Sequence, residues 1–84
     1  MFYVYIIESA RNKRWYYGHT NHLDLRLLDH NSGRNVSTKN CGPWRFIFQR
    51  PIPTIEEAVK FEKHLKLTRN KRFIKNKYSE FFIE

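Results

Sequence analysis

The first apolar stretch of the chain, Phe2 to Ile7, contains only aromatic and β-branched residues. An uninterrupted run of this kind is typical of a strand covered on both faces, so we predict a central strand here. A second apolar stretch, Trp15 to Tyr17, follows a polar segment with the composition of a turn. The two stretches therefore predict a β-hairpin, with its turn near Ala10 and Arg11 and with Gly18 ending its second strand.

From Thr20 onward the hydrophobic spacing changes from that of a strand to that of a helix. Leu23 and Leu27 are four residues apart, and Thr20 or Asn21 is a candidate N-cap. The sequence Asn-Ser-Gly at 31–33 is a stop signal. The pattern predicts one helix of about three turns.

The stretch 44–49 predicts a third strand, because aromatic residues occupy its alternate positions. The alternation indicates a strand with one apolar face. The preceding residues, 35–42, are polar and without periodicity, which indicates a surface loop. Pro51 and Pro53 are expected to end the strand.

Thr54 and Glu57 form the Thr-x-x-Glu pattern of a capping box, which predicts a second helix running to about Leu67. Residues 70–77 predict a short third helix, and residues 81–83 are expected to pack back on the body. The order is ββαβα(α). It predicts an α+β fold in which a short, mainly antiparallel three-stranded sheet is flanked by helices, with residues 1–84 forming a single domain.

The amino-acid composition indicates what class of partner the folded protein binds. Sixteen Lys and Arg against eight Asp and Glu give a net charge of +8, while 40% of the residues are apolar and 17% aromatic. Such a chain is too hydrophobic for a disordered basic tail, so the charge must lie on a folded body. A basic folded domain is expected to bind a polyanion.

Several other classes are excluded. The apolar run Phe2 to Ile7 is much shorter than the ~20 residues of a membrane span, so no membrane partner is expected. The one cysteine, Cys41, excludes an internal disulfide framework and a thiolate zinc site, which favours a reducing, cytoplasmic location. The sequence has no Gly-rich phosphate loop with a Walker lysine and no Gly-x-Ser-x-Gly motif, so a nucleotide cofactor is not expected.

The basic residues concentrate in one part of the chain. Half of all Lys and Arg fall between residues 60 and 77, and they are Lys60, Lys63, Lys66, Arg69, Lys71, Arg72, Lys75 and Lys77. A surface that follows a phosphate backbone would have this composition, and a solvated helix face is the structural alternative.

Glu62 lies on the apolar stripe of the second predicted helix, among Ala58, Phe61 and Leu65. Burying an unpaired carboxylate costs several kcal/mol, so Glu62 must meet a cation, bind a metal or lie at the open end of the stripe. A structural salt bridge and a metal site are both compatible with the sequence.

Arg26 and His30 form a matching pair on the first predicted helix, four residues apart at the edge of its apolar stripe. The structural alternative is that Arg26 pairs with Asp24 or Asp29 while His30 caps the helix C-terminus. The predicted hairpin also brings Tyr5 near Tyr16 across the two strands, where core packing is the structural alternative.

Taken in order, these motifs resemble the GIY-YIG nucleases over nearly the whole chain. Where that family has Gly-Ile-Tyr and Tyr-Ile-Gly, this sequence has Tyr3-Val4-Tyr5 and Tyr16-Tyr17-Gly18. The family's next two motifs correspond to Leu23-x-x-Arg26-Leu27-x-x-His30 and Glu56-Glu57-Ala58-x-x-x-Glu62. The chain is most similar to small stand-alone bacterial members that look like the N-terminal domain of the excinuclease subunit UvrC. It departs from the pattern at Tyr3 and Tyr17, and neither position is catalytic in the family.

The resemblance implies a metal-dependent endonuclease that hydrolyses DNA, with RNA as a further candidate, in repair or recombination. It implies that Glu62 holds one Mg²⁺ or Mn²⁺ and that Arg26 clamps the scissile phosphate. Tyr5 would be the general base with Tyr16 as its partner, while His30 would orient Tyr5 or shuttle its proton. For contacts to the nucleic-acid backbone, the candidates are Lys66, Arg69 and Lys71.

Two other functions remain open. One is a nucleic-acid-binding module that keeps the fold but has weak or no catalytic activity. The other is an adaptor in a larger repair complex, which is disfavoured because no exposed apolar surface is expected once the helices are assigned to the core.

Overall fold

The computed structural model describes residues 1–83. Its elements are, in order, β1 (Phe2–Ser9), β2 (Trp15–Thr20), α1 (Leu23–Asn31), a 3₁₀ turn (Val36–Thr38), β3 (Trp44–Ile52), α2 (Ile55–Thr68), α3 (Lys71–Lys77) and a second 3₁₀ turn (Ser79–Phe81). This order confirms the predicted α+β fold with its three-stranded sheet. No helix within residues 1–83 has the length and hydrophobicity needed to cross a membrane.

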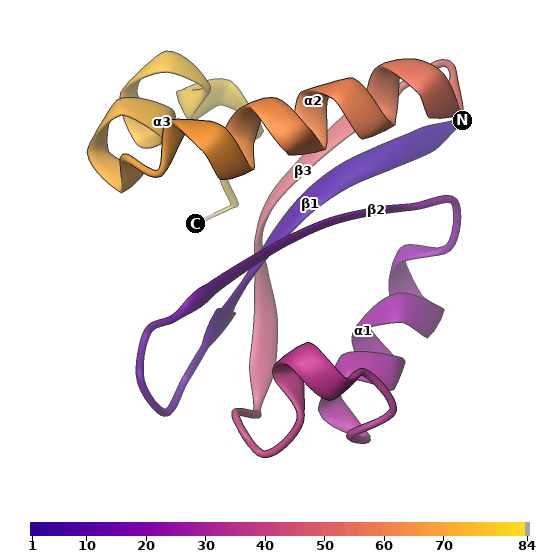
Figure 1. Cartoon of the computed structure of the whole chain (residues 1–84), viewed down its shortest axis with the longest axis vertical. Helices are drawn as coiled ribbons and strands as arrows, with labels where there is room; N and C mark the ends of the chain where they lie inside the picture. The colour runs from indigo at the N-terminus through magenta and orange to yellow at the C-terminus, as the bar shows by residue number, and fades with distance from the viewer. Residues whose placement is uncertain (84) are drawn as a thin grey trace.

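The sheet is antiparallel, and its strand order is β2-β1-β3. The helices α2 and α3 lie on one side of it and α1 lies on the other (Figure 1). Strand β1 is therefore hydrogen-bonded on both edges and covered on both faces, and Val4, Ile6 and Ile7 are fully buried. This position explains why the run from Phe2 to Ile7 has no polar member, and it confirms the predicted central strand.

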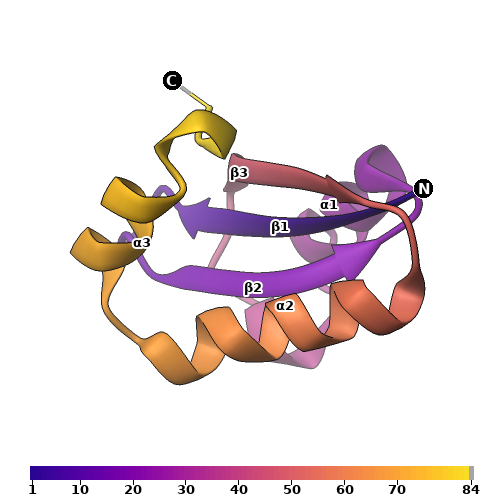
Figure 2. The ribbon, with the colours of Figure 1, turned by 90° about the horizontal axis from the view of Figure 1, so that it is seen from above.

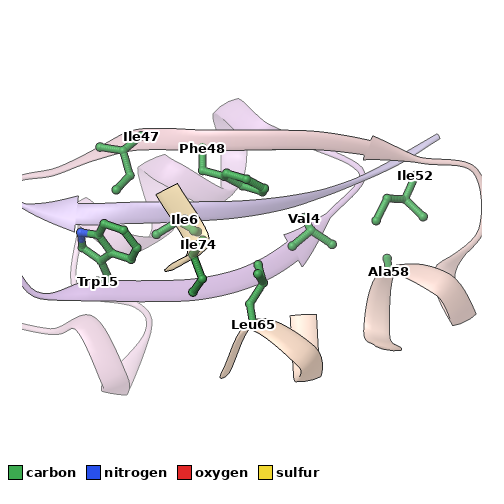
Figure 3. Packing of buried hydrophobic residues seen from close by; sticks show 9 residues of the cluster. All are labelled: Val4, Ile6, Trp15, Ile47, Phe48, Ile52, Ala58, Leu65 and Ile74. Carbon is green, nitrogen blue, oxygen red and sulfur yellow. The ribbon is translucent and has the colours of Figure 1, made fainter. Parts of the chain in front are cut away.

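Each face of the sheet has its own apolar cluster. Nine buried residues form the cluster under α2 and α3 (Figure 3), and they are Val4, Ile6, Trp15, Ile47, Phe48, Ile52, Ala58, Leu65 and Ile74. The smaller cluster on the α1 side contains Tyr5, Ile7 and Trp44, with Leu23 and Leu27 packed against them. Helix α2 runs along the β2 side of the sheet (Figure 2), and Glu62 of α2 contacts His19 of this edge strand.

Strand β3 differs from its prediction in two ways. Its pairing with β1 shifts between Ile6 and Ile7, which pair with Phe48 and Phe46, so Ile47 is an extra residue. This irregularity turns Phe46 toward the α1 cluster and Phe48 toward the α2 cluster, so the prediction of a single apolar face is wrong.

The prediction that Pro51 ends β3 is also wrong. The strand continues to Ile52, and Pro51 pairs with Tyr3. Because β3 is an edge strand of the sheet, it tolerates a residue that has no N–H.

The first helix begins later than predicted, because β2 continues past Gly18 to Thr20. The N-cap of α1 is His22, whose side chain makes no capping hydrogen bond. Thr20 instead forms a local turn, in which its hydroxyl accepts a hydrogen bond from the His22 N–H at 3.0 Å. Neither Thr20 nor Asn21 is therefore the cap.

The second helix agrees with its prediction. The Thr54 hydroxyl accepts a hydrogen bond from the Glu57 N–H at 3.3 Å, which confirms the cap. Helix α2 ends at Thr68, close to the predicted Leu67, and Asn70 caps α3.

Two surface expectations fail. The segment 35–42 is not simply a surface loop, because it forms a 3₁₀ turn that buries Thr38. On α1, Leu25 and Leu28 are each 58% exposed, so some apolar surface does remain outside the core.

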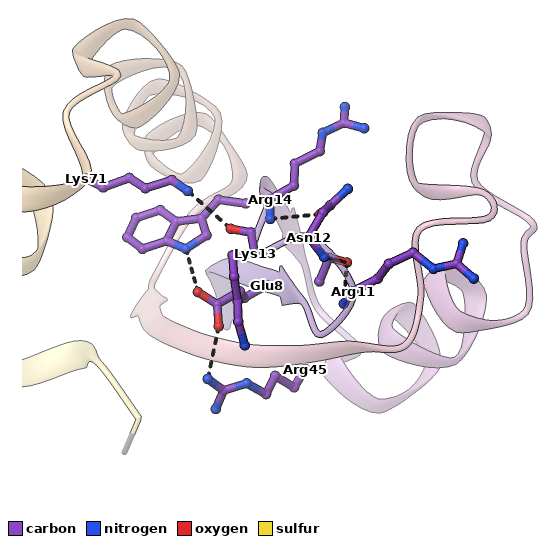
Figure 4. A network of polar contacts seen from close by, with 9 residues as sticks. Glu8, Arg11, Asn12, Lys13, Arg14, Arg45 and Lys71 are labelled. Atoms are coloured by element: carbon purple, nitrogen blue, oxygen red, sulfur yellow. Dashed lines mark hydrogen bonds and ion pairs between the residues drawn. The ribbon is translucent and has the colours of Figure 1, made fainter.

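The turn end of the hairpin is held by a polar network around Glu8 (Figure 4). The Glu8 carboxylate accepts hydrogen bonds from Trp15 Nε1 at 3.1 Å and from Arg45 at 3.0 Å. Lys71 reaches this end from α3 and donates to the Lys13 carbonyl at 3.2 Å. The network ties β1, β2, β3 and α3 together away from the predicted catalytic residues.

Candidate active site

A cavity of about 230 Å³ opens beside the edge strand β2. It is lined by Tyr5, Tyr16, Gly18, His19, Arg26 and Glu62. These residues come from β1, β2, α1 and α2, so the cavity gathers side chains from both faces of the sheet around its edge. Four of the five predicted catalytic residues line it. The fifth, His30, is not part of this lining, but it contacts both Tyr5 and Tyr16.

A larger cavity of about 540 Å³ lies elsewhere, between the hairpin turn and the C-terminal end of α1. Of the predicted catalytic residues it includes His30 alone. Because it lacks Tyr5, Arg26 and Glu62, we assign the candidate site to the smaller cavity.

The hairpin register places the two tyrosines on the same face. Tyr5 pairs with Gly18 and Ile7 pairs with Tyr16, so Tyr5 and Tyr16 are diagonal neighbours across β1 and β2. The Tyr5 side chain crosses directly over Gly18, where an added Cβ would collide with its ring and hydroxyl. The absence of a side chain at Gly18 thus gives Tyr5 access to the sheet edge. Gly18 does not end the strand as predicted, because β2 continues to Thr20.

Tyr5 begins a chain of buried hydrogen bonds. Tyr5 Oη lies 2.8 Å from His30 Nε2, and His30 Nδ1 lies 2.9 Å from Thr38 Oγ1. The exposed fractions of Tyr5, His30 and Thr38 are 2%, 1% and 1%. Both ring nitrogens of His30 are engaged by side chains, so the alternative that His30 serves to cap the end of α1 does not hold.

This environment favours the neutral forms of both rings. Burial, followed by the neighbouring Tyr16, raises the pKa of Tyr5 well above its usual value, and Arg26 offsets part of that rise. Burial and then the positive charge of Arg26 lower the pKa of His30, against a smaller opposing effect of Asp29. At neutral pH the pair is therefore a phenol and an uncharged imidazole.

Arg26 is exposed and lines the cavity from α1. Within residues 1–83 its guanidinium makes no hydrogen bond or ion pair, and Asp29 pairs instead with Arg34 at 3.0 Å. The alternative in which Arg26 is neutralised by Asp24 or Asp29 is therefore absent. An unpaired guanidinium beside a polar cavity is available to a phosphate.

Glu62 lies at the α2 side of the cavity, with 14% of its side chain exposed. Its two oxygens have different partners: His19 Nδ1 is 2.5 Å from Oε1, and Lys66 Nζ is 2.7 Å from Oε2. The salt bridge considered from the sequence thus exists, and the carboxylate also faces the cavity.

Sequence reasoning missed His19 and Thr38. His19 follows Trp15 and Tyr17 at alternate positions of β2, so their shared face points toward α2, and this spacing could have identified it. Thr38 has no comparable signal, because its partner His30 lies on a separate element.

The predicted backbone-contact residues are all exposed, but they differ in their surroundings. Lys66 is paired with Glu62, and Lys71 lies over the Trp15 ring with its Nζ 4.9 Å from the ring centroid. Arg69 ends α2 in the left-handed backbone region with φ of 51°. The other basic residues of 60–77 are also exposed along α2 and α3.

A pre-formed multi-ligand metal site is not part of this arrangement. Residues 1–83 contain no group of three His, Cys, Asp or Glu side chains placed to hold an ion together. Glu62 is the one carboxylate among the residues that line the cavity.

Comparison with known proteins identifies the family. The GIY-YIG catalytic domain matches residues 1–79. The UPF0213 protein BH0048 of Halalkalibacterium halodurans is 38% identical over 72 residues, which are 83% of this chain and 76% of that protein. The UPF0213 protein YazA of Bacillus subtilis is 36% identical over 72 residues, which are 83% of this chain and 72% of its own.

A solved structure supports the same relationship. The solution NMR structure of the UPF0213 protein BH0048 from Bacillus halodurans matches with a TM-score of 0.55 and 33% identity, over 94% of this chain and 84% of that one. None of these relatives bears on the narrower resemblance to UvrC, which stays a prediction. The chain belongs to the GIY-YIG catalytic domain family, and its homologues are UPF0213 proteins.

Proposed function

We propose that this protein is a metal-dependent endonuclease that hydrolyses phosphodiester bonds in DNA. The observation that carries the proposal is the cavity beside β2, where Tyr5, Tyr16, Arg26 and Glu62 meet from four different elements. Hydrolysis of a phosphodiester requires a base for the attacking water and positive charge near the phosphate. One cavity contains candidates for each of these roles.

Glu62 suits a hard divalent cation such as Mg²⁺ or Mn²⁺. Its carboxylate faces the cavity and offers oxygen ligands, and a single carboxylate is enough for an ion that keeps several waters. His19 and Lys66 each contact one of its two oxygens, so a cation would compete with them for the carboxylate. When bound, the cation would supply positive charge to the phosphate and lower the pKa of a coordinated water.

Tyr5 and His30 together would remove the proton from the attacking water. As the water oxygen bonds to phosphorus, its proton moves to Tyr5 Oη, and the Tyr5 hydroxyl proton moves to His30 Nε2, 2.8 Å away. The bond from phosphorus to the leaving oxygen breaks, that oxygen takes a proton from solvent, and the proton on His30 then returns through Tyr5 to solvent, which restores the neutral pair. This transfer avoids a free phenolate, which burial of Tyr5 disfavours through its raised pKa.

Arg26 would bind the scissile phosphate, because its exposed guanidinium faces the cavity without an acidic partner in the described chain. Tyr16, whose ring centroid is 4.8 Å from that of His30, would help to position the water. The exposed basic residues of α2 and α3 would follow the DNA backbone, and the proposed contacts include Lys66, Arg69 and Lys71.

The proposal extends to the biological setting. We infer that residues 1–84 act as a single nuclease domain that is UvrC-like and directed to DNA structure or damage in repair or recombination. RNA is a further candidate substrate, and a larger repair complex is a candidate partner. A cytoplasmic location is part of the same proposal.

Pairing of Glu62 supports the alternative of a binding module with little or no catalytic activity. Lys66 pairs with one oxygen of this carboxylate and His19 contacts the other, so a stable arrangement would keep a cation out and leave a basic surface that only binds nucleic acid. The two functions differ in whether the protein shows metal-dependent cleavage that requires Glu62.

Cleavage of labelled DNA tests the proposal. Single-stranded, duplex and branched substrates are incubated with Mg²⁺, with Mn²⁺ or with EDTA. We expect metal-dependent cutting by the wild type, none by Glu62→Gln or Tyr5→Phe, and normal cutting by Glu8→Gln, which changes a similarly shielded carboxylate outside the cavity.

Binding measured on the same substrates separates the two functions. Glu62→Gln should keep the DNA affinity of the wild type, since the residue lost is acidic and not part of the basic surface. Salt-sensitive binding without cleavage by the wild type would favour the binding module, and cleavage by Glu62→Gln at the wild-type rate would remove Glu62 from the mechanism.

A further inference from the structure

Thr38 is a buried polar residue for which the mechanism above has no use. It ends the 3₁₀ turn Val36–Thr38 behind His30, on the side away from Tyr5. Its backbone carbonyl accepts hydrogen bonds from Trp44 Nε1 at 3.1 Å and from the Cys41 N–H at 3.3 Å. Trp44 is itself buried in the α1-side cluster, so the position of Thr38 is fixed by the core.

The direction of the hydrogen bonds at Thr38 determines the direction at His30. A threonine hydroxyl has one proton and can also accept, and that of Thr38 has two neighbours: the Asn35 carbonyl oxygen at 3.4 Å, which can only accept, and His30 Nδ1 at 2.9 Å. The arrangement that uses both contacts has the hydroxyl donate to Asn35 and accept from His30 Nδ1, which places the ring proton on Nδ1.

An uncharged imidazole carries one N–H, so protonation at Nδ1 leaves Nε2 as an acceptor. The lowered pKa of His30, caused first by its burial and next by Arg26, is consistent with the uncharged ring. The group opposite Nε2 is the Tyr5 hydroxyl, which must therefore donate. The proton order runs from Tyr5 through His30 and Thr38 to Asn35.

We propose that Thr38 is a positioning residue that fixes the Nδ1-protonated tautomer of His30 and thereby directs the Tyr5 hydroxyl proton away from the cavity. The role rests on the proposed nuclease function, but the tautomer itself does not. With its proton directed to His30, the Tyr5 oxygen presents only lone pairs to the cavity, so it can accept a proton from water. In the opposite tautomer Nε2–H would donate to Tyr5, so His30 could not accept the Tyr5 proton, which would point into the cavity instead.

The tautomer can be measured without any nuclease assay. Long-range ¹H–¹⁵N NMR spectra of histidine-labelled protein distinguish Nδ1–H from Nε2–H, and His30→Gln assigns the His30 signals among those of the four histidines. Spectra are recorded at about pH 8, above the ordinary imidazole pKa of about 6.5. The two test variants are Thr38→Val, which keeps the shape but removes the acceptor, and Thr38→Ser, which keeps the hydroxyl.

We expect the Nδ1–H tautomer in the wild type and in Thr38→Ser, and a shift toward Nε2–H in Thr38→Val. Cleavage by Thr38→Val should fall about tenfold or more in kcat with an unchanged KM for DNA, while Thr38→Ser stays near the wild type. A merely structural role would lower stability without changing the tautomer. If Thr38→Val does not fold, Thr38→Ala removes the same oxygen and takes its place.

The results separate this inference from the nuclease proposal. An Nε2–H tautomer in the wild type, or an unchanged Nδ1–H tautomer in the variant lacking the hydroxyl, would overturn the inference even if the protein cuts DNA. The expected tautomers in a protein that cuts nothing would instead overturn the nuclease proposal and leave Thr38 as the residue that orients His30.

Discussion

Glu8 and Glu62 are two shielded carboxylates at different ends of the sheet, and their local pairing is similar. Their side chains are 15% and 14% exposed. Each contacts one aromatic ring nitrogen and one longer cationic side chain: Glu8 contacts Trp15 and Arg45, and Glu62 contacts His19 and Lys66. Burial and pairing alone would not distinguish a structural carboxylate from a candidate metal ligand.

The surroundings distinguish them. The cavity beside Glu8 has a volume of about 360 Å³, and Ile47, Phe82 and Ile83 form part of its lining. Besides Glu8, its polar lining residues are one serine and two cationic residues. The cavity beside Glu62 has two tyrosines and an exposed arginine. Burial acts to raise the pKa of Glu8, but hydrogen bonds from Trp15 and Arg45 and nearby positive charge lower it overall. A catalytic carboxylate is recognised here by the groups across the cavity from it.

The largest expected effect is the loss of cleavage in Glu62→Gln, by about 10³-fold, because the variant lacks the charge that holds the cation. Its free energy of unfolding should stay within about 1 kcal/mol of the wild type, since both partners of Glu62 are partly exposed. Single-turnover cleavage rates and urea unfolding measure the two quantities. Glu8→Gln is the matched control, and an equal loss of cleavage in that variant would remove the distinction between the carboxylates.

Replacing Arg26 should have the next largest effect. Arg26→Gln should slow cleavage by about 10²-fold because the phosphate loses a charged donor. Its melting temperature should not change, because Arg26 is exposed and makes no ion pair within the described chain. Arg45→Gln removes the same charge beside Glu8 and serves as the control. If both variants cut DNA at the wild-type rate, Arg26 has no role in the chemistry.

Glu8 should affect stability and not cleavage. Glu8→Gln keeps an acceptor for Trp15 but loses the charge opposite Arg45, which is largely exposed, so we expect a loss of about 1 kcal/mol. Because folding lowers the pKa of Glu8, its contribution is complete above the unfolded value of about 4.3 and disappears as the pH falls through the folded pKa. Chemical unfolding at a series of pH values should therefore show the wild type and the variant converging in acid. Parallel curves down to low pH would contradict this assignment.

The sequence predicted the elements whose signals are local. The apolar run of β1 and the cap at Thr54 depend on neighbouring residues, and both agree with the structure. The extra residue at Ile47 could not be predicted, because it arises from the register of β3 against β1. Pro51 misled the prediction for a similar reason, since its effect depends on β3 being an edge strand.

The candidate site was predicted in part. The family motifs pointed to Tyr5, Arg26 and Glu62, which the fold brings to one cavity, although their roles remain predictions. The His19–Glu62 contact joins residues 43 positions apart, and the Tyr5–His30 contact joins residues 25 apart. Partners at such separations follow from the packing of α1 and α2 on opposite faces of the sheet, which no local pattern contains.

The smallest expected effect concerns Lys66, which competes with a cation for Glu62. An exposed ion pair of this kind is worth up to about 1 kcal/mol, so Lys66→Gln should tighten Mn²⁺ binding by up to about fivefold. Electron paramagnetic resonance of unbound Mn²⁺ measures this affinity, and Lys60→Gln removes a charge from the same helix without touching Glu62.

Binding of DNA by the same two variants reports on the second role of Lys66. A lysine that contacts a phosphate contributes about one unit to the slope of log affinity against log salt, so Lys66→Gln should lose that unit. If Mn²⁺ binding tightens while the slope stays unchanged, Lys66 is a partner of Glu62 and not a backbone contact. If neither quantity differs from that of Lys60→Gln, the pair holds Glu62 too weakly to compete with a cation, and the pairing of Glu62 no longer favours an inactive binding module.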